Sequence, residues 1–387
     1  GDLYVAPTGT DSASGSMSEP TSLSAAIGRI AAGHSIWLRG GTYELKAQLT
    51  IERASSGQEG QRKILAALPG EQPILDFSGE PYAADSNPRG LQINADYWHI
   101  RGLTVRKAAD NGIYVAGSHN IVERCITHGN RDTGLQIGRA GSSVTRDEWP
   151  SDNLILNCES YDNYDAPPGT GENADGFAAK LTVGDGNVFR GCVSHHNIDD
   201  GWDLYTKTDT GAIGAVTIDQ CVAHDNGRLT DGTSNASGDR NGFKLGGEKI
   251  AVPHVVTRSV AYDNGKNGFT WNSNPGAIRL SNTLAFDNAD GNYRFGDNDT
   301  PTQAVFTNNV SLWTQSAAKS DKAVGEDASG SNCFYSSSGT AGSKSAKGLS
   351  CSTADFAQDL SKIELKRGMD GSLDWSVFGL AAGSDLI

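Results

Sequence analysis

The sequence lacks any apolar run near the roughly 18 residues that cross a bilayer, and it begins without a basic and apolar leader. We therefore expect no membrane partner, and we expect that any export signal has already been removed. Basic residues are also scarce, since 32 Lys and Arg stand against 46 Asp and Glu, for a net charge of −14. This balance argues against nucleic acid as a partner. It does not exclude an anionic sugar polymer, because a cation bound between protein and polymer reverses the local sign.

Cysteine and methionine are both sparse. The six cysteines include no C-x-x-C pair, so neither a zinc ribbon nor a thioredoxin-like motif is supported. Cys333 and Cys351 lie in a Ser- and Gly-rich stretch, where we predict a disulfide that contributes about 3 kcal/mol. The other four cysteines recur inside a repeat and are predicted to lie in the core. Two methionines against 48 glycines favour short strands and tight turns over helices.

The strongest positive feature is a repeat that begins near Trp98. Each copy has a short β-type run, then a small residue, then an asparagine five residues later, with 24 to 38 residues between copies. The pairs are Cys125 and Asn130, Cys158 and Asn163, Cys192 and Asn197, Cys221 and Asn226, Ser259 and Asn264, and Thr283 and Asn288. Such a repeat, without a helical period, predicts an all-β, right-handed parallel β-helix. The asparagines are expected to bond the backbone and one another, each bond contributing about 0.5–1.5 kcal/mol.

The other segments fit around this solenoid as one domain of residues 1–387. Residues 22–32 have helical spacing, with Ser22 or Ser24 as a cap, and predict a short helix that covers the N-terminal end of the core. We assign residues 1–45 to this cap region and 46–313 to the β-helix coils. Residues 314–387 are predicted to form an irregular C-terminal extension that packs on the outside of the helix.

Three segments share an outline in which a polar residue precedes a glycine and an aromatic ring follows it. They are residues 173–177, 199–203 and 240–244. Aligned on their glycines, they give one row of Asp175, Asp200 and Asn241 and a second row of Ala178, Asp203 and Lys244. Neighbouring parallel strands lie about 4.8 Å apart, so the acidic side chains and the lysine are expected to share one patch.

Four carboxylates without a nearby histidine or cysteine ligand suit a hard cation. Ca²⁺ takes six to eight oxygen ligands and tolerates irregular geometry, whereas Zn²⁺ prefers nitrogen or sulfur. We therefore predict a calcium site formed by Asp175, Asp199, Asp200 and Asp203. The alternative is that these aspartates are merely solvated, which their mutual repulsion disfavours.

Lys244 is the candidate base. Neighbouring cations and partial burial would lower its pKa from about 10.4. Beside a cation that binds anionic oxygen, a neutral lysine suits removal of the C5 proton of a uronate polymer, followed by departure of the C4 oxygen, which is β-elimination. The alternative is an ordinary lysine in a salt bridge to Asp203. Lys180 and Arg139 are candidate ligands of substrate carboxylates.

Aromatic residues near the site alternate with the candidate site residues. Trp202, Phe243 and Phe269 should therefore stack in the core rather than form a sugar platform. His195 and His196 are adjacent, so we expect them to point to opposite sides of a strand and not to share a metal.

Four motifs in this order resemble the pectate lyases of polysaccharide lyase family 9, and the resemblance extends to about residue 313. They are residues 173–177, 199–204, 241–247 and 268–272, joined by similar N-terminal segments at 4–9 and 40–43. The resemblance implies a right-handed β-helix and a secreted enzyme that acts on pectic polysaccharides. It also implies calcium held by Asp175, Asp199, Asp200 and Asp203, with Lys244 as the Brønsted base.

Three other functions remain open. A rhamnogalacturonan lyase would keep the chemistry and change the substrate. A glycoside hydrolase would use two of the aspartates as acid and base, with no need of calcium. A β-helical carbohydrate-binding protein would tolerate loss of Lys244. We expect a pectate lyase that cleaves polygalacturonate as a monomer.

Overall fold

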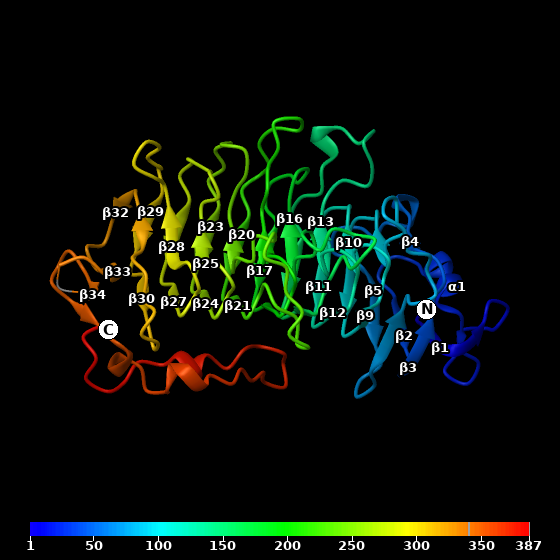
Figure 1. Ribbon diagram of the computed structural model, residues 1–387. Helices are drawn as coiled ribbons and strands as arrows, with labels where there is room; N and C mark the ends of the chain where they lie inside the picture. The colour runs from blue at the N-terminus through cyan, green and yellow to red at the C-terminus, as the bar shows by residue number, and fades with distance from the viewer. Residues whose placement is uncertain (340, 387) are drawn as a thin grey trace.

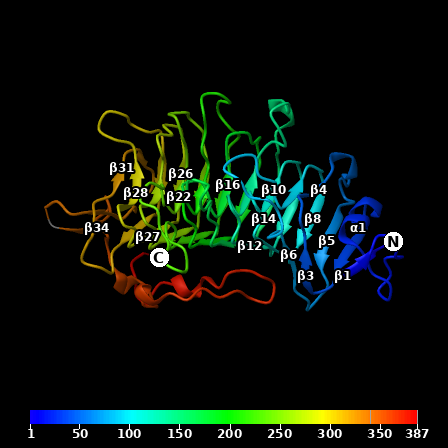
Figure 2. The same ribbon diagram turned by 45° about the vertical axis from the view of Figure 1, so that its right-hand side comes forward.

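The computed structural model describes residues 1–339 and 341–386, and three long sheets of parallel strands dominate it (Figure 1). From β2 to β32, successive strands of the chain enter the three sheets in turn, so each full coil adds one strand to each sheet. The coils stack along one axis from the N-terminal to the C-terminal part of the chain (Figures 1 and 2). The predicted all-β parallel β-helix is therefore confirmed.

Sheet A has twelve strands, and sheets B and C have ten each. Sheet A comprises β1 (Leu3–Thr10), β2 (Ser35–Leu38), β5 (Lys63–Ala67), β8 (Trp98–Arg101), β11 (Ile121–Glu123), β14 (Leu154–Leu156), β17 (Val188–Arg190), β20 (Thr217–Asp219), β23 (Val255–Thr257), β26 (Arg279–Ser281), β29 (Val305–Thr307) and β32 (Glu326–Asp327). Sheet B comprises β3 (Gly41–Glu44), β6 (Pro73–Asp76), β9 (Thr104–Arg106), β12 (Ile126–His128), β15 (Glu159–Tyr161), β18 (Val193–His195), β21 (Val222–His224), β24 (Val260–Tyr262), β27 (Leu284–Phe286) and β30 (Val310–Leu312). Sheet C comprises β4 (Leu49–Ile51), β7 (Leu91–Ile93), β10 (Ile113–Val115), β13 (Leu135–Ile137), β16 (Phe177–Ala179), β19 (Trp202–Asp203), β22 (Phe243–Lys244), β25 (Asn267–Thr270), β28 (Gly291–Phe295) and β31 (Lys322–Ala323).

The interior of the coils is filled by apolar side chains that stack in register. In sheet A, for example, Val122 pairs with Ile155, and Ile155 pairs with Phe189, and all three are fully buried. The four cysteines of the repeat, Cys125, Cys158, Cys192 and Cys221, are buried in the same core, as predicted. Most of the long apolar interior is thus built from residues that recur once per coil.

The predicted asparagine ladder is confirmed. Asn163 donates its side-chain amide to Asn197 at 2.8 Å, and Asn197 donates to Asn226 at 3.0 Å. The ladder continues in both directions through Asn130, Asn264 and Asn288. These residues are almost fully buried, so the amide chain satisfies polar groups that would otherwise destabilise the bend.

The residue directly before each ladder asparagine adopts the left-handed backbone conformation. Asp162, His196 and Asp225 all have φ of 53°, and Asp263 has φ of 54°. The strands of sheet B that precede the ladder asparagines therefore end in a sharp bend. A side chain at such a bend therefore does not continue the alternation of side chains between the two faces of the preceding strand.

The N-terminal end of the core is covered by α1 (Leu23–Arg29), as predicted. The Ser22 hydroxyl accepts a hydrogen bond from the Ala25 amide at 3.2 Å and caps the helix. Leu23, Ala26 and Ile27 face the core. In the described residues, no helix is both long and apolar enough to span a membrane.

The first part of the predicted extension continues the coils, because β31 and β32 join sheets C and A. From β33 (Phe334–Ser336) onwards the C-terminal extension leaves the coils, and its last part runs along the outside of the stack, where it is drawn in red (Figures 1 and 2). It holds β33, β34 (Gly342–Lys344) and β35 (Ser350–Cys351) and the 3₁₀ turns Thr353–Asp355, Leu360–Lys362 and Trp375–Phe378; two further 3₁₀ turns, Arg53–Ser55 and Arg146–Glu148, lie in earlier loops. The predicted Cys333–Cys351 disulfide is present. Arg367 anchors the extension by donating to the carbonyl oxygens of Gly191 at 2.8 Å and Cys158 at 3.1 Å.

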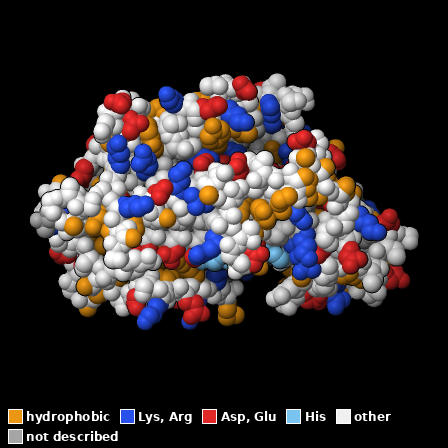
Figure 3. All heavy atoms as spheres, viewed as in Figure 1, with side chains coloured by type: hydrophobic (Ala, Val, Ile, Leu, Met, Phe, Trp, Pro, Cys, Tyr) orange, Lys and Arg blue, Asp and Glu red, His pale blue; other side chains and the backbone are white. Residues whose placement is uncertain are grey.

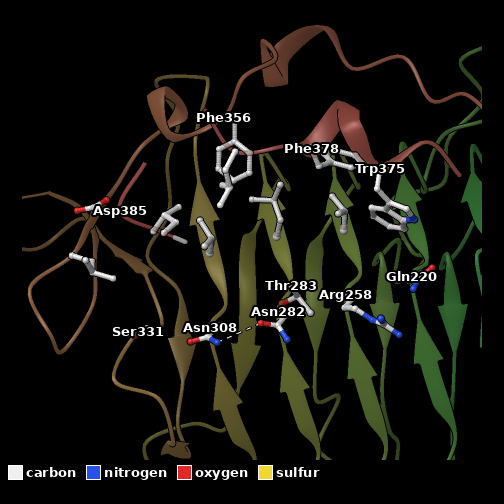
Figure 4. Close-up of a pocket in the computed structure, with 16 residues that line it drawn as sticks. Gln220, Arg258, Asn282, Thr283, Asn308, Ser331, Phe356, Trp375, Phe378 and Asp385 are labelled. Carbon is white, nitrogen blue, oxygen red and sulfur yellow. Dashed lines mark hydrogen bonds between the residues drawn. The ribbon is translucent and has the colours of Figure 1, made fainter. Parts of the chain in front are cut away.

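A cavity of about 560 Å³ lies between the extension and the bends that join sheets A and B. Phe356, Trp375 and Phe378 of the extension face Arg258 and a row of amide side chains across it (Figure 4). The candidate site lies elsewhere, on sheet C. This cavity therefore does not mark the candidate site.

Candidate metal and catalytic site

The candidate site is formed on the outer face of sheet C by β16, β19 and β22. Ala178 pairs with Asp203, and Asp203 pairs with Lys244, so the predicted row is confirmed. A Cβ at Gly201 would lie 2.5 Å from the carbonyl oxygen of Gly242. A side chain there would collide with the next coil. Glycine before each strand therefore lets the coils approach closely and brings the acidic residues together.

Below this row, aromatic rings hold the strands in register. Trp202 stacks on Phe243 with ring centroids 4.8 Å apart, and Phe243 stacks on Phe269 at 4.8 Å. All three rings are fully buried. The predicted core ladder is confirmed, and it gives the site a rigid base.

Three of the predicted carboxylates converge. One oxygen from each of Asp175, Asp200 and Asp203 lies within 4.8 Å of the others, and all three residues are buried. Asp175 accepts hydrogen bonds from the Thr133 hydroxyl at 3.1 Å and from the Asp200 amide at 3.0 Å. These bonds hold the carboxylates in place from the protein side.

Asp200 presents one oxygen to the middle of this group. Its Oδ1 accepts hydrogen bonds from the amide and the side chain of Asn241 at 2.8 and 3.0 Å. Its Oδ2 is buried and has no hydrogen bond. A buried carboxylate oxygen that lacks a hydrogen bond and lies among two other carboxylates is a natural ligand for a cation.

Asp199 lies outside the group of three. Its Oδ1 accepts hydrogen bonds from the amides of Asp239 at 2.7 Å and Arg240 at 3.3 Å. It therefore fixes the end of the loop that precedes β22. Its place as a fourth calcium ligand stays a prediction.

Lys244 reaches the same carboxylates from the next coil. Its side chain is 7% exposed, and its Nζ lies 3.3 Å from Asp200 Oδ2 and 3.7 Å from Asp203 Oδ2. Its shortest contact is with Asp239 Oδ2, at 2.7 Å. The Tyr205 ring lies 5.1 Å from the ammonium nitrogen and closes one side of the site.

Lys180 also joins the cluster. Its Nζ donates to Asp175 Oδ2 at 3.0 Å and to Asp203 Oδ2 at 3.2 Å. Together with Arg139, it lines a cavity of about 440 Å³ beside the carboxylates. Lys180 and Arg139 are thus brought to one side of the site, but Lys180 is engaged by the acidic residues themselves. Figure 3 shows acidic and basic side chains side by side near the middle of this face.

The pKa values of the cluster follow from burial and charge. Burial raises the pKa of Asp175 to about 7 and that of Asp200 to about 8, and the other carboxylates add to both shifts. Burial would also raise the pKa of Asp203, but Lys244 and Lys180 hold it below its usual value. Burial alone would lower the pKa of Lys244, yet Asp203 and Asp200 outweigh it and raise the pKa. A role as base therefore needs a cation that competes for these carboxylates.

Sequence reasoning missed two participants. Asp239 lies in the loop before β22, and loop geometry cannot be read from the glycine alignment. Arg89 stacks over the ring of Tyr114, with 3.5 Å between the guanidinium carbon and the ring centroid, in the cavity that holds Lys180. Tyr114 pairs with Gln136 in the outward-facing row of sheet C. That row indicates where the tyrosine lies but not that Arg89 is its partner.

The expectation that His195 and His196 point to opposite sides of a strand is wrong, whereas the expectation that these two do not share a metal stays a prediction. The Nδ1 atoms of His195 and His196 lie 2.8 Å apart. His195 ends β18, whereas His196 occupies the left-handed bend, so the alternation of a strand does not separate the two rings.

Known proteins of similar sequence and fold identify the family of this chain. The sequence model of the Pel9A-like, right-handed β-helix region matches residues 3–315. Pectate lyase L of Paenibacillus polymyxa (strain SC2) is 50% identical over 100% of this chain and 83% of its own length. The crystal structure of pectate lyase Pel9A superposes with a TM-score of 0.80 at 33% identity, covering 100% of this chain and 90% of that one.

A rhamnogalacturonan lyase structure superposes with a TM-score of 0.79 at 24% identity, covering 100% of this chain and 97% of that one, which shows a shared fold. The family match covers more than three quarters of the chain, and the 50% identity extends over its full length. The chain therefore belongs to the Pel9A-like right-handed β-helix family and is an enzyme of the polysaccharide lyase class.

Proposed function

We propose that this chain is a calcium-dependent pectate lyase that cleaves α-1,4-linked polygalacturonate by β-elimination, with Lys244 as the base. One observation carries the proposal: a buried lysine stands in register beside three converging carboxylates on the outer face of one sheet. Relatives named pectate lyase, at up to 50% identity, support the substrate.

Lys244 would take the C5 proton, which is acidic because it lies α to the uronate carboxylate. The C5–H electron pair then forms the C4–C5 double bond, and the C4 oxygen leaves with the departing chain. The ammonium that results is held by Asp239 at 2.7 Å. Tyr205 and the rigid aromatic ladder fix the position of the Lys244 stem, so that the amine meets one face of the sugar ring.

The donor set fits Ca²⁺. Asp175, Asp200 and Asp203 would hold the ion, with Asp199 as a fourth ligand, because all their donors are oxygen and one buried oxygen of Asp200 has no hydrogen bond. Bound calcium would neutralise the carboxylates and stabilise the negative charge that develops on the substrate carboxylate.

Lys180 and Arg139 would bind the carboxylates of neighbouring sugars. Both line the cavity next to the acidic group, and Lys180 is released from Asp175 and Asp203 when a cation takes its place. We also propose that the enzyme is secreted, because its polymer substrate lies outside the cell. One chain supplies every residue assigned here, so a monomer suffices.

The test follows the ultraviolet absorbance of the unsaturated product. Polygalacturonate and rhamnogalacturonan are each incubated with the protein in calcium and in chelator. Absorbance should grow only in the incubation that contains both polygalacturonate and calcium. A preference for rhamnogalacturonan would keep the mechanism and change the substrate. Reducing ends that accumulate without absorbance would instead indicate hydrolysis.

A further inference from the structure

Away from the acidic cluster, the outer face of sheet B carries a continuous stack of rings. Each ring lies 4.8–5.0 Å from the next, and every pair is parallel within 10°. The stack contains His128, Tyr161, His195, His224, Tyr262 and Phe286. Two neighbouring positions in it are therefore histidines on adjacent strands, β18 and β21.

The left-handed bends add two more polar side chains at this point. His196 follows His195, and Asp225 follows His224, and both bend residues have φ of 53°. The His196 ring stands perpendicular to both stacked histidines, with centroids 5.1 Å from His195 and 6.0 Å from His224. Two coils thus bring three imidazoles and a carboxylate together.

Hydrogen bonds orient these rings. Glu159 Oε1 lies 2.8 Å from His195 Nε2, and His195 Nδ1 lies 2.8 Å from His196 Nδ1. On the next coil, Asp225 Oδ2 lies 2.8 Å from His224 Nδ1. Glu159 thus fixes His195, which in turn fixes the His196 ring, and such an outer partner is typical of a histidine that binds a metal. His196, His224 and Asp225 are each half-buried, so an ion could reach them from solvent.

We propose that His196, His224 and Asp225 form a second metal site, for Zn²⁺ or a similar transition-metal ion, which clamps two successive coils. One donor atom from each of the three lies within 4.8 Å of the other two. Donors in a tetrahedral zinc site stand about 3.3 Å apart, given bonds of about 2.0–2.1 Å, so small side-chain rotations would close the site.

The ligand chemistry separates this site from the acidic cluster. Imidazole nitrogen with one carboxylate suits zinc, nickel or copper, whereas the all-oxygen cluster on sheet C suits calcium. Asp162 occupies the preceding bend and adds negative charge near His196, while Arg228 pairs with Asp225 at 3.3 Å. Because the site is on sheet B, its role is to stabilise the coils rather than to act on substrate.

The test uses the protein without a histidine tag, freed of metal and kept in excess Ca²⁺ so that the acidic cluster does not take the probe. Co²⁺ is titrated and followed by its visible absorption, and Zn²⁺ is titrated by calorimetry. The variants are His196→Ala and His224→Phe, of which the second keeps the ring stack. The matched control is His128→Phe, a histidine of the same stack that is followed by a glycine.

Wild type and His128→Phe should bind one Co²⁺ with intense, four-coordinate bands, displaced by Zn²⁺, and Zn²⁺ should raise their melting temperature. His196→Ala and His224→Phe should each lose at least about tenfold in Co²⁺ affinity and lose the Zn²⁺ effect on melting. Lyase activity in calcium should be unchanged in His196→Ala and in His224→Phe. Equal Co²⁺ affinity in wild type and either folded variant would overturn the site, as would no binding to wild type.

Discussion

Replacing Lys244 by methionine should separate catalysis from metal binding. Methionine keeps the length of the stem and removes the charge, which lies 3.3 Å from Asp200 and 3.7 Å from Asp203. Two unit charges about 4 Å apart attract by about 4 kcal/mol at an effective dielectric constant near 20. The freed carboxylates should therefore bind Ca²⁺ at least about tenfold more tightly, which corresponds to about 1.4 kcal/mol. The rate should fall by about 10²–10⁴-fold, the contribution of a positioned base.

The control for this variant is Lys180→Met. It removes an ammonium group from the same cluster, 3.0 Å from Asp175 and 3.2 Å from Asp203. It should also tighten calcium binding, but it should raise KM and keep most of kcat. Initial rates on polygalacturonate are measured by ultraviolet absorbance, and calcium affinity by calorimetry. The reasoning is refuted if Lys244→Met retains kcat, or if its activity and calcium affinity fall together.

Three further predictions concern the cluster and the fold. Asp200→Asn should lower calcium affinity at least about tenfold while the amide oxygen keeps the bond to Asn241; unchanged affinity by calorimetry would remove Asp200 from the site. In chelator, the free energy of unfolding should fall as pH rises from about 4 to 8. In the folded protein the pKa values of Asp175 and Asp200 are raised to about 7 and 8. The folded state therefore holds protons that the unfolded state has already lost in this range. Calcium should suppress that fall, and parallel melting curves with and without calcium across this range would contradict it. Asn197→Ala should destabilise by about 1–3 kcal/mol, because Asn163 and Asn226 each lose a buried side-chain hydrogen bond; denaturant midpoints equal to wild type would count against the ladder.

The sequence predicted the parts of this molecule that repeat. An invariant offset between a small residue and an asparagine marks the same bend in every coil, so the asparagine ladder and the core cysteines could be placed before any coordinates. The glycine alignment worked for a related reason: the close approach of coils at Gly201 excludes a side chain there. The spacing of the repeat and the small size of glycine can both be read directly from a single sequence.

The features that were missed depend on structure that does not repeat. Asp239 reaches Lys244 from an inserted loop, and its place is set by the hydrogen bonds that Asp199 accepts from the loop backbone. Lys180 was placed on the correct side, but its pairing with Asp175 and Asp203 depends on how two flexible lysine side chains share four carboxylates. The contact between His195 and His196 follows from the left-handed backbone conformation of His196. Residues other than glycine adopt this conformation rarely, so the sequence did not predict it.

The most direct measurement is the absorbance time course of the wild-type protein on polygalacturonate after exhaustive removal of metal, followed by addition of Ca²⁺ alone. We predict no growth of absorbance in chelator and immediate growth once calcium is in excess, with 4,5-unsaturated oligogalacturonides as the product. Full turnover in the ion-free preparation would contradict the account, because a lysine held protonated by Asp200 and Asp203 could not then be the base.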